Sequence, residues 1–245
     1  MKIIILAGGK GTRMKSDLPK ALMPLKGKPM ISHVLEAVAS SGVDEKPIIV
    51  VGYGKEKVME TLGPRYEFVV QDKQLGTGHA VMSAEETLKD RAENIMVLPA
   101  DHPRISPDTI KKLAQLHMKT GAQITMAAIK LPDFKDWRNF FYDNFSRVVR
   151  NTNGQIIKSV ELKDASEEEK NITEVNPIFL CFDAKWLWEK IKNLRPENAQ
   201  NEYYMTDLIQ MAIEDGQKIE SVEIDPKEGM AANSRVELER LEQFE

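Results

Sequence analysis

The sequence predicts an α/β fold built on a doubly wound, mostly parallel sheet, with a small β-hairpin part in its second half. Short apolar runs alternate with helix-like stretches up to residue 130, and a glycine-rich loop follows the first run. Further along, Asn153-Gly154 separates two strand-like runs, as a hairpin turn would. A chain of 245 residues is long enough to bury such a core, so we expect one domain over 1–245.

Five strands are predicted in the front half, at 3–7, 47–51, 68–70, 95–98 and 124–129. Each is a short apolar run of the kind that parallel sheets bury on both faces. Helices between them are predicted by apolar residues at helical spacing. One has Pro29 in its first turn and ends near Gly42, and three more lie around 58–62, 80–88 and 110–116.

The back half has a different texture. The runs 146–150 and 155–160 flank Asn153-Gly154, which predicts a hairpin with a type I′ turn. The acid-rich segment 164–170 is expected to be a solvated linker and 175–182 a single strand, with helices at 184–193, 206–215 and 236–244. The aromatic connection after residue 131 carries Trp137, Phe140, Phe141 and Tyr142, and fits either a local hydrophobic cluster or a lid.

The composition is that of an ordinary globular protein, with 42% apolar and 29% charged residues. The net charge of −4 and the mixing of acidic and basic residues argue against nucleic acid as a partner. Cys181 is the only cysteine and lies in an apolar run, so a buried, inert thiol is expected. No apolar segment is long enough to span a membrane or to form a signal-peptide core, so we expect a cytoplasmic protein.

The loop after the first strand holds three glycines within four residues and reads Leu6, Ala7, Gly8, Gly9, Lys10, Gly11, Thr12 and Arg13. Without Cβ atoms, its backbone can close around a ligand and direct several N–H groups at an anion. Lys10, Arg13 and Lys20 add cationic side chains near the same place. The loop therefore predicts a phosphate-rich ligand, with a plain tight turn as the alternative.

Two better-known phosphate loops do not match this pattern. The spacing G-x-x-x-x-G-K-[ST] of a P-loop does not occur. A dinucleotide fingerprint needs a third glycine where Met14 stands, and an acidic residue where Gly52 follows the second strand. A dinucleotide-dependent oxidoreductase is therefore disfavoured.

Two further stretches end predicted strands at the same edge of the sheet. Gln71 follows the third strand, and its amide can both donate and accept at a uracil edge. The Gly76-Thr77-Gly78 turn lets backbone approach a flat ligand, although a helix cap is an equal alternative. Asp101 ends the fourth strand, and one carboxylate there can begin a Mg²⁺ site, because Mg²⁺ takes few protein oxygens beside water and phosphate.

Together, the stretches 6–14, 19–22, 71–80 and 99–103 resemble the signature of nucleotidyltransferases that activate sugar phosphates. The chain is most similar to the uridylyltransferase domain of bacterial N-acetylglucosamine-1-phosphate uridylyltransferase, over nearly its whole length. The resemblance implies a Rossmann-like fold in which 1–130 binds the nucleotide and 131–245 the sugar. No hexapeptide repeat occurs, so the acetyltransferase domain of bifunctional relatives is not expected in this chain.

The resemblance also implies roles for individual residues. The nucleotide would be bound by Leu6, Ala7, Gly8, Gly9, Lys10, Gly11, Thr12, Gln71, Gly76 and Thr77. The catalytic residues would be Arg13, which holds the leaving β- and γ-phosphates with Lys10, Lys20, which neutralises the reacting phosphates, and Asp101. Asp101 would hold Mg²⁺ together with Asn233, for which a helix cap is the alternative. The sugar would be bound by Ser146, Glu161, Asn176, Glu202 and Thr206.

The sugar end departs from the family pattern. Where relatives have Gly-Tyr-Gly-Arg-Ile, this chain has Asn144-Phe145-Ser146-Arg147-Val148, so both glycines are lost. Pro177 stands after Asn176, where relatives offer a backbone N–H. We therefore expect an intact phosphate and metal end and an altered sugar pocket.

The expected reaction joins UTP and N-acetylglucosamine 1-phosphate, with Mg²⁺, into UDP-N-acetylglucosamine and pyrophosphate. One alternative is the same chemistry on another sugar 1-phosphate, such as glucose 1-phosphate. Another is a non-catalytic nucleotide-sugar-binding module, which is disfavoured because Arg13, Lys20, Asp101 and Asn233 are all present. The sequence predicts no particular oligomeric state.

Overall fold

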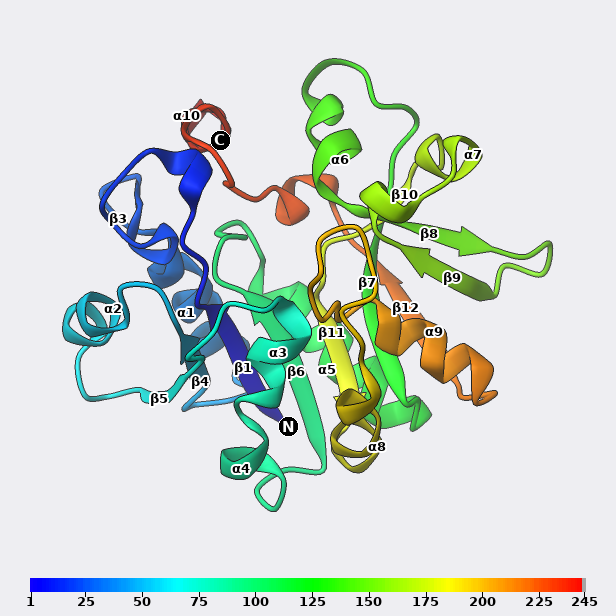
Figure 1. Ribbon diagram of the computed structural model, residues 1–245, viewed down its shortest axis with the longest axis horizontal. Helices are drawn as coiled ribbons and strands as arrows, with labels where there is room; N and C mark the ends of the chain where they lie inside the picture. Colours follow the sequence, from blue (N-terminus) through cyan, green and yellow to red (C-terminus); the bar gives the residue numbers. More distant parts are fainter. Residues whose placement is uncertain (244–245) are drawn as a thin grey trace.

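The computed structural model describes residues 1–243, and its centre is a ten-stranded sheet covered by helices (Figure 1). The strand order is β5-β4-β1-β6-β11-β7-β10-β8-β9, with β12 paired to β7. The strands are β1 Lys2–Ala7, β4 Ile48–Val51, β5 Glu67–Val70, β6 Asn94–Pro99, β7 Ile124–Lys130, β8 Ser146–Arg150, β9 Ile156–Val160, β10 Glu174–Asn176, β11 Leu180–Asp183 and β12 Ile219–Glu223. A separate two-stranded sheet is made by β2 Pro24–Leu25 and β3 Lys28–Pro29.

The helices are α1 Met30–Ser41, α2 Lys55–Leu62, α3 Thr77–Met82, α4 Glu85–Leu88, α5 Pro107–Thr120, α6 Asn139–Asn144, α7 Glu167–Lys170, α8 Ala184–Lys190, α9 Asp207–Glu214 and α10 Arg235–Gln243. Short 3₁₀ helices include η1 Thr12–Met14, η2 Lys20–Leu22, η4 Leu162–Asp164 and η5 Ile191–Asn193. The last residue of the predicted C-terminal helix, Phe244, lies outside the described residues. Within residues 1–243, no helix combines the length and the hydropathy needed to cross a membrane.

The front of the sheet is parallel, as predicted. Strands β5, β4, β1 and β6 run in one direction, and β11 lies antiparallel between β6 and β7. The register aligns Ala7 with Val51 and Leu6 with Pro99, so three strands end at one edge. The glycine loop after β1 and the residues after β6 therefore meet there. This arrangement confirms the α/β class with a mostly parallel sheet.

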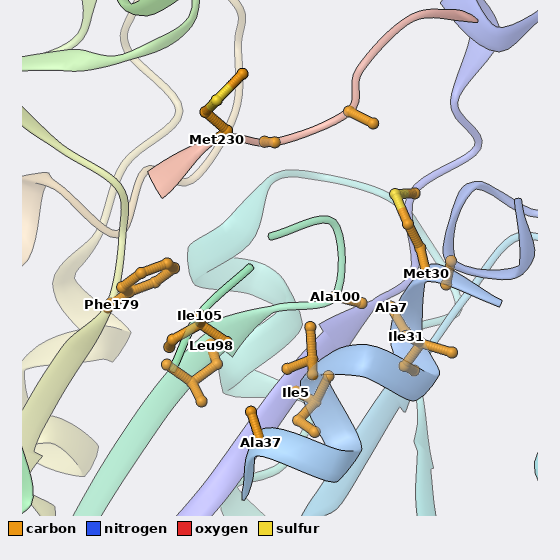
Figure 2. Close-up of a cluster of buried hydrophobic side chains, with 14 of the residues drawn as sticks. Ile5, Ala7, Met30, Ile31, Ala37, Leu98, Ala100, Ile105, Phe179 and Met230 are labelled. Carbon is orange, nitrogen blue, oxygen red and sulfur yellow. The ribbon is translucent and has the colours of Figure 1, made fainter. Parts of the chain in front are cut away.

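The alternation of side chains along β1 builds two apolar layers. Ile3 and Ile5 join the layer covered by α1, α2 and α5, whereas Ile4 joins the layer covered by α3, α4, α8 and α9. All three isoleucines are completely buried. Figure 2 shows side chains of β1, β6 and α1 meeting in the first layer. The sheet is thus fixed from both sides, which holds the ends of its strands in place.

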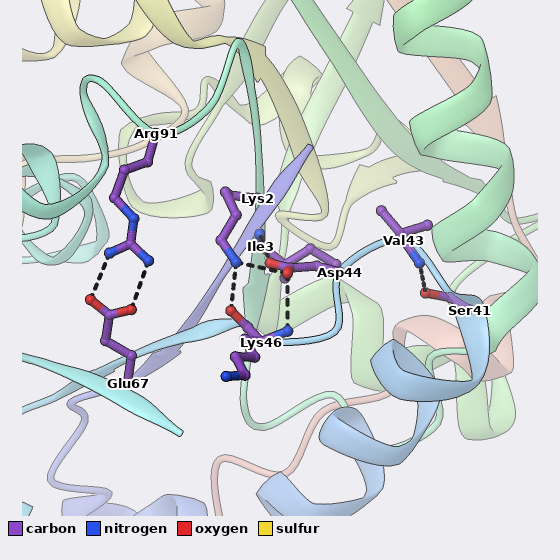
Figure 3. Close-up of polar contacts among 8 residues, drawn as sticks. All are labelled: Lys2, Ile3, Ser41, Val43, Asp44, Lys46, Glu67 and Arg91. Carbon is purple, nitrogen blue, oxygen red and sulfur yellow. Dashed lines mark hydrogen bonds and ion pairs between the residues drawn. The ribbon is translucent and has the colours of Figure 1, made fainter. Parts of the chain in front are cut away.

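At the amino-terminal end of β1, a buried carboxylate holds the strand in place. Asp44, 8% exposed, accepts hydrogen bonds from Ile3 N and Lys2 Nζ, each at 2.8 Å, and from Lys46 N at 3.1 Å (Figure 3). A buried carboxylate is stable only with such partners. This cluster anchors the start of β1 and leaves its other end free to carry the glycine loop.

Three expectations about the back half were wrong in detail. The hairpin of β8 and β9 forms, but its turn is not type I′, because Asn153 has no positive φ and Gly154 N donates to Asn151 O at 2.9 Å. The predicted strand 175–182 is two strands, β10 and β11, separated where Pro177 lacks an N–H and Ile178 adopts a φ of 62°. The predicted linker 164–170 contains α7, which begins with a capping box of Ser166 and Glu169.

The aromatic connection is a local cluster. Phe140, Phe141 and Phe145 are each at most 5% exposed and belong to the apolar layer under α1 and α5. Phe141 packs with Phe140 at 5.2 Å between ring centroids and 83° between planes. The first of the two alternatives for this connection is therefore confirmed. The sequence did not predict α6, the short helix that carries two of these rings, or the edge strand β12.

A buried arginine secures this connection to the hairpin. Arg147, completely buried, donates to the carbonyl oxygens of Phe145 at 2.5 Å, Tyr142 at 2.7 Å and Lys170 at 3.1 Å. Its guanidinium also lies 5.0 Å from the centre of the Phe134 ring. The carbonyls at the end of α6 thus find partners in one side chain on β8.

Candidate active site

A cavity of about 370 Å³ lies at the carboxyl edge of the parallel strands. It is lined by Leu6, Ala7, Gly8, Gly9, Lys10, Gly11, Thr12, Lys20, Ala21, Gln71, Gln74, Gly76, Thr77, Ala80, Pro99, Ala100, Asp101 and Glu202. All ten residues predicted to bind the nucleotide line it, together with Lys20, Asp101 and Glu202. Open α/β sheets bind ligands at this place because strand ends and helix starts converge there.

The glycine loop forms the floor of the cavity. Gly8 O accepts a hydrogen bond from Tyr53 N at 3.1 Å, which joins the loop to the turn after β4. Lys10 extends over the Tyr53 ring, with Nζ 5.3 Å from its centre. Arg13 is exposed on η1 and does not line the cavity. The loop thus offers its backbone and Lys10 to the cavity, whereas Arg13 lies outside the lining.

Three side chains from distant parts of the chain meet at the end of β6. Lys20 Nζ donates to Asp101 Oδ2 and, at 2.6 Å, to Asn233 Oδ1. Asp101 and Lys20 are 19% and 14% exposed. Two oxygen ligands are therefore directed at one cation.

The charge state of this cluster follows from its surroundings. Burial by itself would raise the pKa of Asp101, but the charge of Lys20, with smaller contributions from His102 and hydrogen bonds, lowers it. Burial lowers the pKa of the neighbouring His102 to about 4, so this imidazole is neutral at pH 7. His102 packs against the rings of Phe145 and Phe179, as a loop residue with a structural role would. Asp101 is thus the ionised member of the pair.

The Gln71 loop forms the opposite wall. Gln71 is buried, and its Nε2 donates to Gly76 O at 3.1 Å. Gly76 has a φ of 106°, and a Cβ there would come within 2.7 Å of Tyr203 O. Only glycine therefore allows this turn to approach the segment around Tyr203 so closely.

That segment links the two ends of the site. Tyr203 N donates to Leu75 O and Gly78 N donates to Tyr203 O, each at 2.8 Å, and Met205 N donates to Thr77 Oγ1 at 3.2 Å. Glu202, at its start, lines the cavity. The residues predicted for the nucleobase and those predicted for the sugar are thus held by one run of hydrogen bonds.

Glu202 lines the cavity, and the other four predicted sugar residues fall into two pairs outside its lining. Glu161 Oε1 accepts from Thr206 Oγ1 at 3.0 Å. Burial, and more weakly the charges of Asp207, Asp164 and Glu202, raise the pKa of Glu161 to about 7, while the hydrogen bond from Thr206 opposes the shift. Glu161 is therefore poised between its neutral and charged forms near pH 7.

The second pair is Ser146 and Asn176, which lie opposite each other on β8 and β10. Both are at most 2% exposed. Among the described residues, Ser146 Oγ and Asn176 Nδ2 have no hydrogen-bond partner. Asn176 Oδ1 accepts from Ile178 N at 2.7 Å and so fixes the turn after Pro177. Two buried polar atoms with no partner need either a ligand or water.

Sequence reasoning missed two polar residues of the site. Gln74 lines the cavity, and its Nε2 donates to Gln71 O at 3.1 Å. His79 lies beside Gln71, with Nδ1 at 3.2 Å from Nε2 of the amide. Both belong to the stretch 71–80 that had been singled out. The spacing of residues in the sequence does not show that Gln74 and His79 contact Gln71.

Comparison with known proteins agrees with this geometry. Residues 3–202 match the model of the MobA-like NTP transferase domain. The chain belongs to this family. The bifunctional protein GlmU of Carboxydothermus hydrogenoformans is 44% identical over 242 residues, which are 98% of this chain and 52% of the relative. That of Shouchella clausii is 42% identical over 240 residues, 98% of this chain and 51% of the relative.

The chain therefore spans about half the length of these two relatives. A solved structure of UDP-glucose pyrophosphorylase complexed with UDP-glucose superimposes with a TM-score of 0.77 at 18% identity, covering 98% of this chain and 96% of that one. At that identity the likeness shows the fold alone. The family match and the relatives confirm the resemblance inferred from the motifs.

Proposed function

We propose that this chain transfers a uridylyl group from UTP to N-acetylglucosamine 1-phosphate, giving UDP-N-acetylglucosamine and pyrophosphate. The observation that carries the proposal is the convergence of the glycine loop, the Lys20–Asp101–Asn233 cluster and the Gln71 loop around one cavity. The identity to the GlmU proteins over 98% of the chain supports it. The nucleotide would lie across the glycine loop with its base toward Gln71.

The chemistry is a displacement at the α-phosphorus of UTP. An oxygen of the sugar phosphate forms a bond to this phosphorus, and the bond to the oxygen bridging the α- and β-phosphates breaks. The electron pair leaves with pyrophosphate. No general base is needed, because a phosphate monoester with a second pKa of about 6 is mostly dianionic at pH 7. The protein contributes positioning and stabilisation of negative charge.

The cations of the site match this need. The backbone of the glycine loop, with Lys10 and Arg13, would bind the β- and γ-phosphates that leave. Lys20 reaches into the cavity and would neutralise the phosphate groups that react. Arg13, exposed in the free protein, would turn toward the triphosphate when it binds.

The residues present fit Mg²⁺. Asp101 and Asn233 each direct an oxygen at the Lys20 ammonium, and carboxylate and amide oxygens are ligands that Mg²⁺ accepts. Among residues 1–243, no cluster of three or more acidic, histidine or cysteine side chains could hold a metal. Asp101 and Asn233 would supply the protein ligands, because their oxygens already meet at one cation. When bound, the ion would neutralise phosphate charge.

The sugar would be bound by residues of the back half. Glu202 lines the cavity. The carboxyl group of Glu161, hydrogen-bonded to Thr206, would bind hydroxyl groups of the sugar. Ser146 Oγ and Asn176 Nδ2, both buried and without a partner among the described residues, supply further polar atoms.

The test is a steady-state screen of four nucleoside triphosphates against sugar 1-phosphates, with release of pyrophosphate and formation of nucleotide sugar measured together. UTP with N-acetylglucosamine 1-phosphate should give the highest kcat/KM. A higher value with glucose 1-phosphate would transfer the proposal to that sugar. Nucleotide binding without turnover in any combination would indicate a non-catalytic binding module.

A further inference from the structure

The orientation of the Gln71 amide is fixed by two neighbours. Its Nε2 lies 3.1 Å from Gly76 O and 3.2 Å from His79 Nδ1. A backbone carbonyl can only accept, so the atom that faces Gly76 must be the amide nitrogen. The same nitrogen faces His79 Nδ1, which must therefore be the bare, accepting nitrogen of the imidazole. His79 then carries its proton on Nε2.

This arrangement uses both hydrogens of the amide. One is directed at Gly76 O and the other at His79 Nδ1, so the amide has no donor left for a ligand. Its Oε1 lies against Gly8, where a Cβ would come within 2.7 Å of it. Gly8 and Gln71 both line the cavity. Gln71 was expected both to donate a hydrogen bond to the base and to accept one from it. In this arrangement it can only accept one.

An acceptor at this position distinguishes between pyrimidine bases. Uracil carries a hydrogen on N3 and can donate it to Oε1, whereas N3 of cytosine is itself an acceptor. With its N3 facing Oε1, cytosine would leave two buried acceptors opposed and unpaired. If the amide rotated by half a turn, its nitrogen would face the base and this preference would be lost.

We propose that His79 is a positioning residue for base selection, which holds the Gln71 amide with Oε1 toward the nucleobase and so favours uracil over cytosine. The inference rests on the proposed function, because it concerns the nucleotide bound in the same cavity. His79 does not line the cavity and would act through Gln71. If His79 lost its accepting nitrogen, the hydrogen bond to Gly76 O would be the remaining one of these two contacts to hold the orientation of the Gln71 amide.

His79 also has a packing role that the test must separate. Its ring lies 6.1 Å from that of Tyr203, with 37° between the planes. Asparagine in its place keeps an accepting oxygen at the branch position of Nδ1, whereas leucine has nearly the same shape without an acceptor. His79→Asn and His79→Leu therefore differ in the hydrogen bond and share the loss of the ring. A simple loss of packing would affect both variants alike.

The experiment measures kcat/KM with UTP and with CTP at saturating sugar 1-phosphate for the wild type and both variants. We expect the UTP-to-CTP ratio to fall by about tenfold or more in His79→Leu and to stay within about threefold of wild type in His79→Asn. The loss should appear in KM for UTP more than in kcat. Equal ratios in all three proteins would overturn the inference, as would equal falls in the two variants.

A second measurement does not depend on a variant that folds well. Long-range nitrogen–proton NMR correlations of the wild-type protein report which ring nitrogen of His79 is protonated, and the signal is assigned by its loss in His79→Asn. The Nε2–H tautomer is expected, and an Nδ1–H tautomer would overturn the inference. If no nucleotide is turned over by the wild type, the proposed function fails, whatever the tautomer. If UTP is turned over and preferred but the leucine variant keeps that preference, only the inference fails.

Discussion

The cluster of Lys20, Asp101 and Asn233 makes the sharpest prediction. Asp101→Asn keeps the shape of the side chain and removes the charge that faces the Lys20 ammonium. Lys20→Met removes the cation instead and leaves the carboxylate with no ion partner on that side. The double variant removes both charges. Each protein can be compared with Asp215→Asn, which breaks the peripheral ion pair of Asp215 with Lys190 (2.7 Å).

The expected magnitude follows from burial. Exposed ion pairs contribute about 0–1 kcal/mol, and removal of one partner from a fully buried pair costs about 3–5 kcal/mol. With 14% and 19% of the two side chains exposed at the edge of a cavity, the Lys20–Asp101 pair falls between these limits. Each single variant should lose about 1–2 kcal/mol of unfolding free energy, and the coupling in the cycle should be at least about 1 kcal/mol.

The assay is equilibrium unfolding in urea without ligands, at pH 7 and at lower pH. The pKa of Asp101 in the folded protein lies below its usual 3.8. The ionised carboxylate therefore makes its full contribution to the unfolding free energy above pH 3.8, and this contribution is lost as the pH falls through the pKa of the folded protein.

Turnover with Mg²⁺ should fall by about a hundredfold or more in Asp101→Asn. Asp215→Asn should retain turnover.

Two results would contradict this reasoning. A coupling energy near zero would mean that Lys20 and Asp101 do not interact in solution. Activity of Asp101→Asn within a few-fold of wild type, with an unchanged melting temperature, would show that Asp101 neither pairs with Lys20 nor supports catalysis.

Three further predictions concern the back half. The pKa of Glu161 is raised from 4.5 to about 7, so the folded state keeps a proton that the unfolded chain releases, and unfolding free energy falls as pH rises between these values. Glu161→Gln should therefore gain stability over wild type progressively from pH 4.5 to pH 7 in thermal melts, and a constant difference would contradict this. Ser146→Gly should raise the kcat/KM preference for N-acetylglucosamine 1-phosphate over glucose 1-phosphate, because the Ser146 side chain is buried and its removal would open space at the proposed sugar end. A strong preference that is the same in wild type and variant would reject this idea. Arg147→Met should lose about 3 kcal/mol in urea unfolding, because three carbonyl groups lose a charged donor. A loss below about 1 kcal/mol would mean that water replaces the guanidinium.

The front half of the fold could be predicted because its signals are local. Each parallel strand is a continuous apolar run, and Gly42 ends α1 in the left-handed conformation, with a φ of 67°, that glycine adopts freely. β12 has no such run: only Ile219 and Val222 of its five residues are apolar, and the strand is mostly half-buried at the edge of the sheet. Its pairing with β7 comes from the tertiary structure, which the sequence pattern does not contain.

In the back half, two local sequence signals indicated the observed structure, but the composition of the surrounding residues favoured a different prediction. Pro177 interrupts the run 175–182 and removes an N–H, but the apolar character on both sides favoured one strand. The spacing of Ser166 and Glu169 is that of a capping box, which the acidic composition of the segment concealed. In both places one or two specific residues determined the local structure, and the average composition of the segment did not.

The site was predictable to the extent that strand ends define it. Gly8, Gln71 and Asp101 each follow a strand of the parallel sheet, and the topology brings them to one cavity. The contacts of Lys20 with Asp101 and Asn233 join positions 81 and 213 residues apart, and no local pattern encodes them. The orientation of Gln71 by His79 depends in the same way on side-chain geometry, which only the structure supplies.

The central claim is that UTP is attacked at its α-phosphorus by a sugar phosphate. The most direct measurement uses two preparations of UTP, one labelled at the α-phosphate and one at the γ-phosphate, with N-acetylglucosamine 1-phosphate and Mg²⁺. The α-label should appear in UDP-N-acetylglucosamine and the γ-label in pyrophosphate, in equal amounts and at equal rates. Release of the γ-label as inorganic phosphate, or an α-label that stays in UTP while the protein binds both substrates, would contradict it.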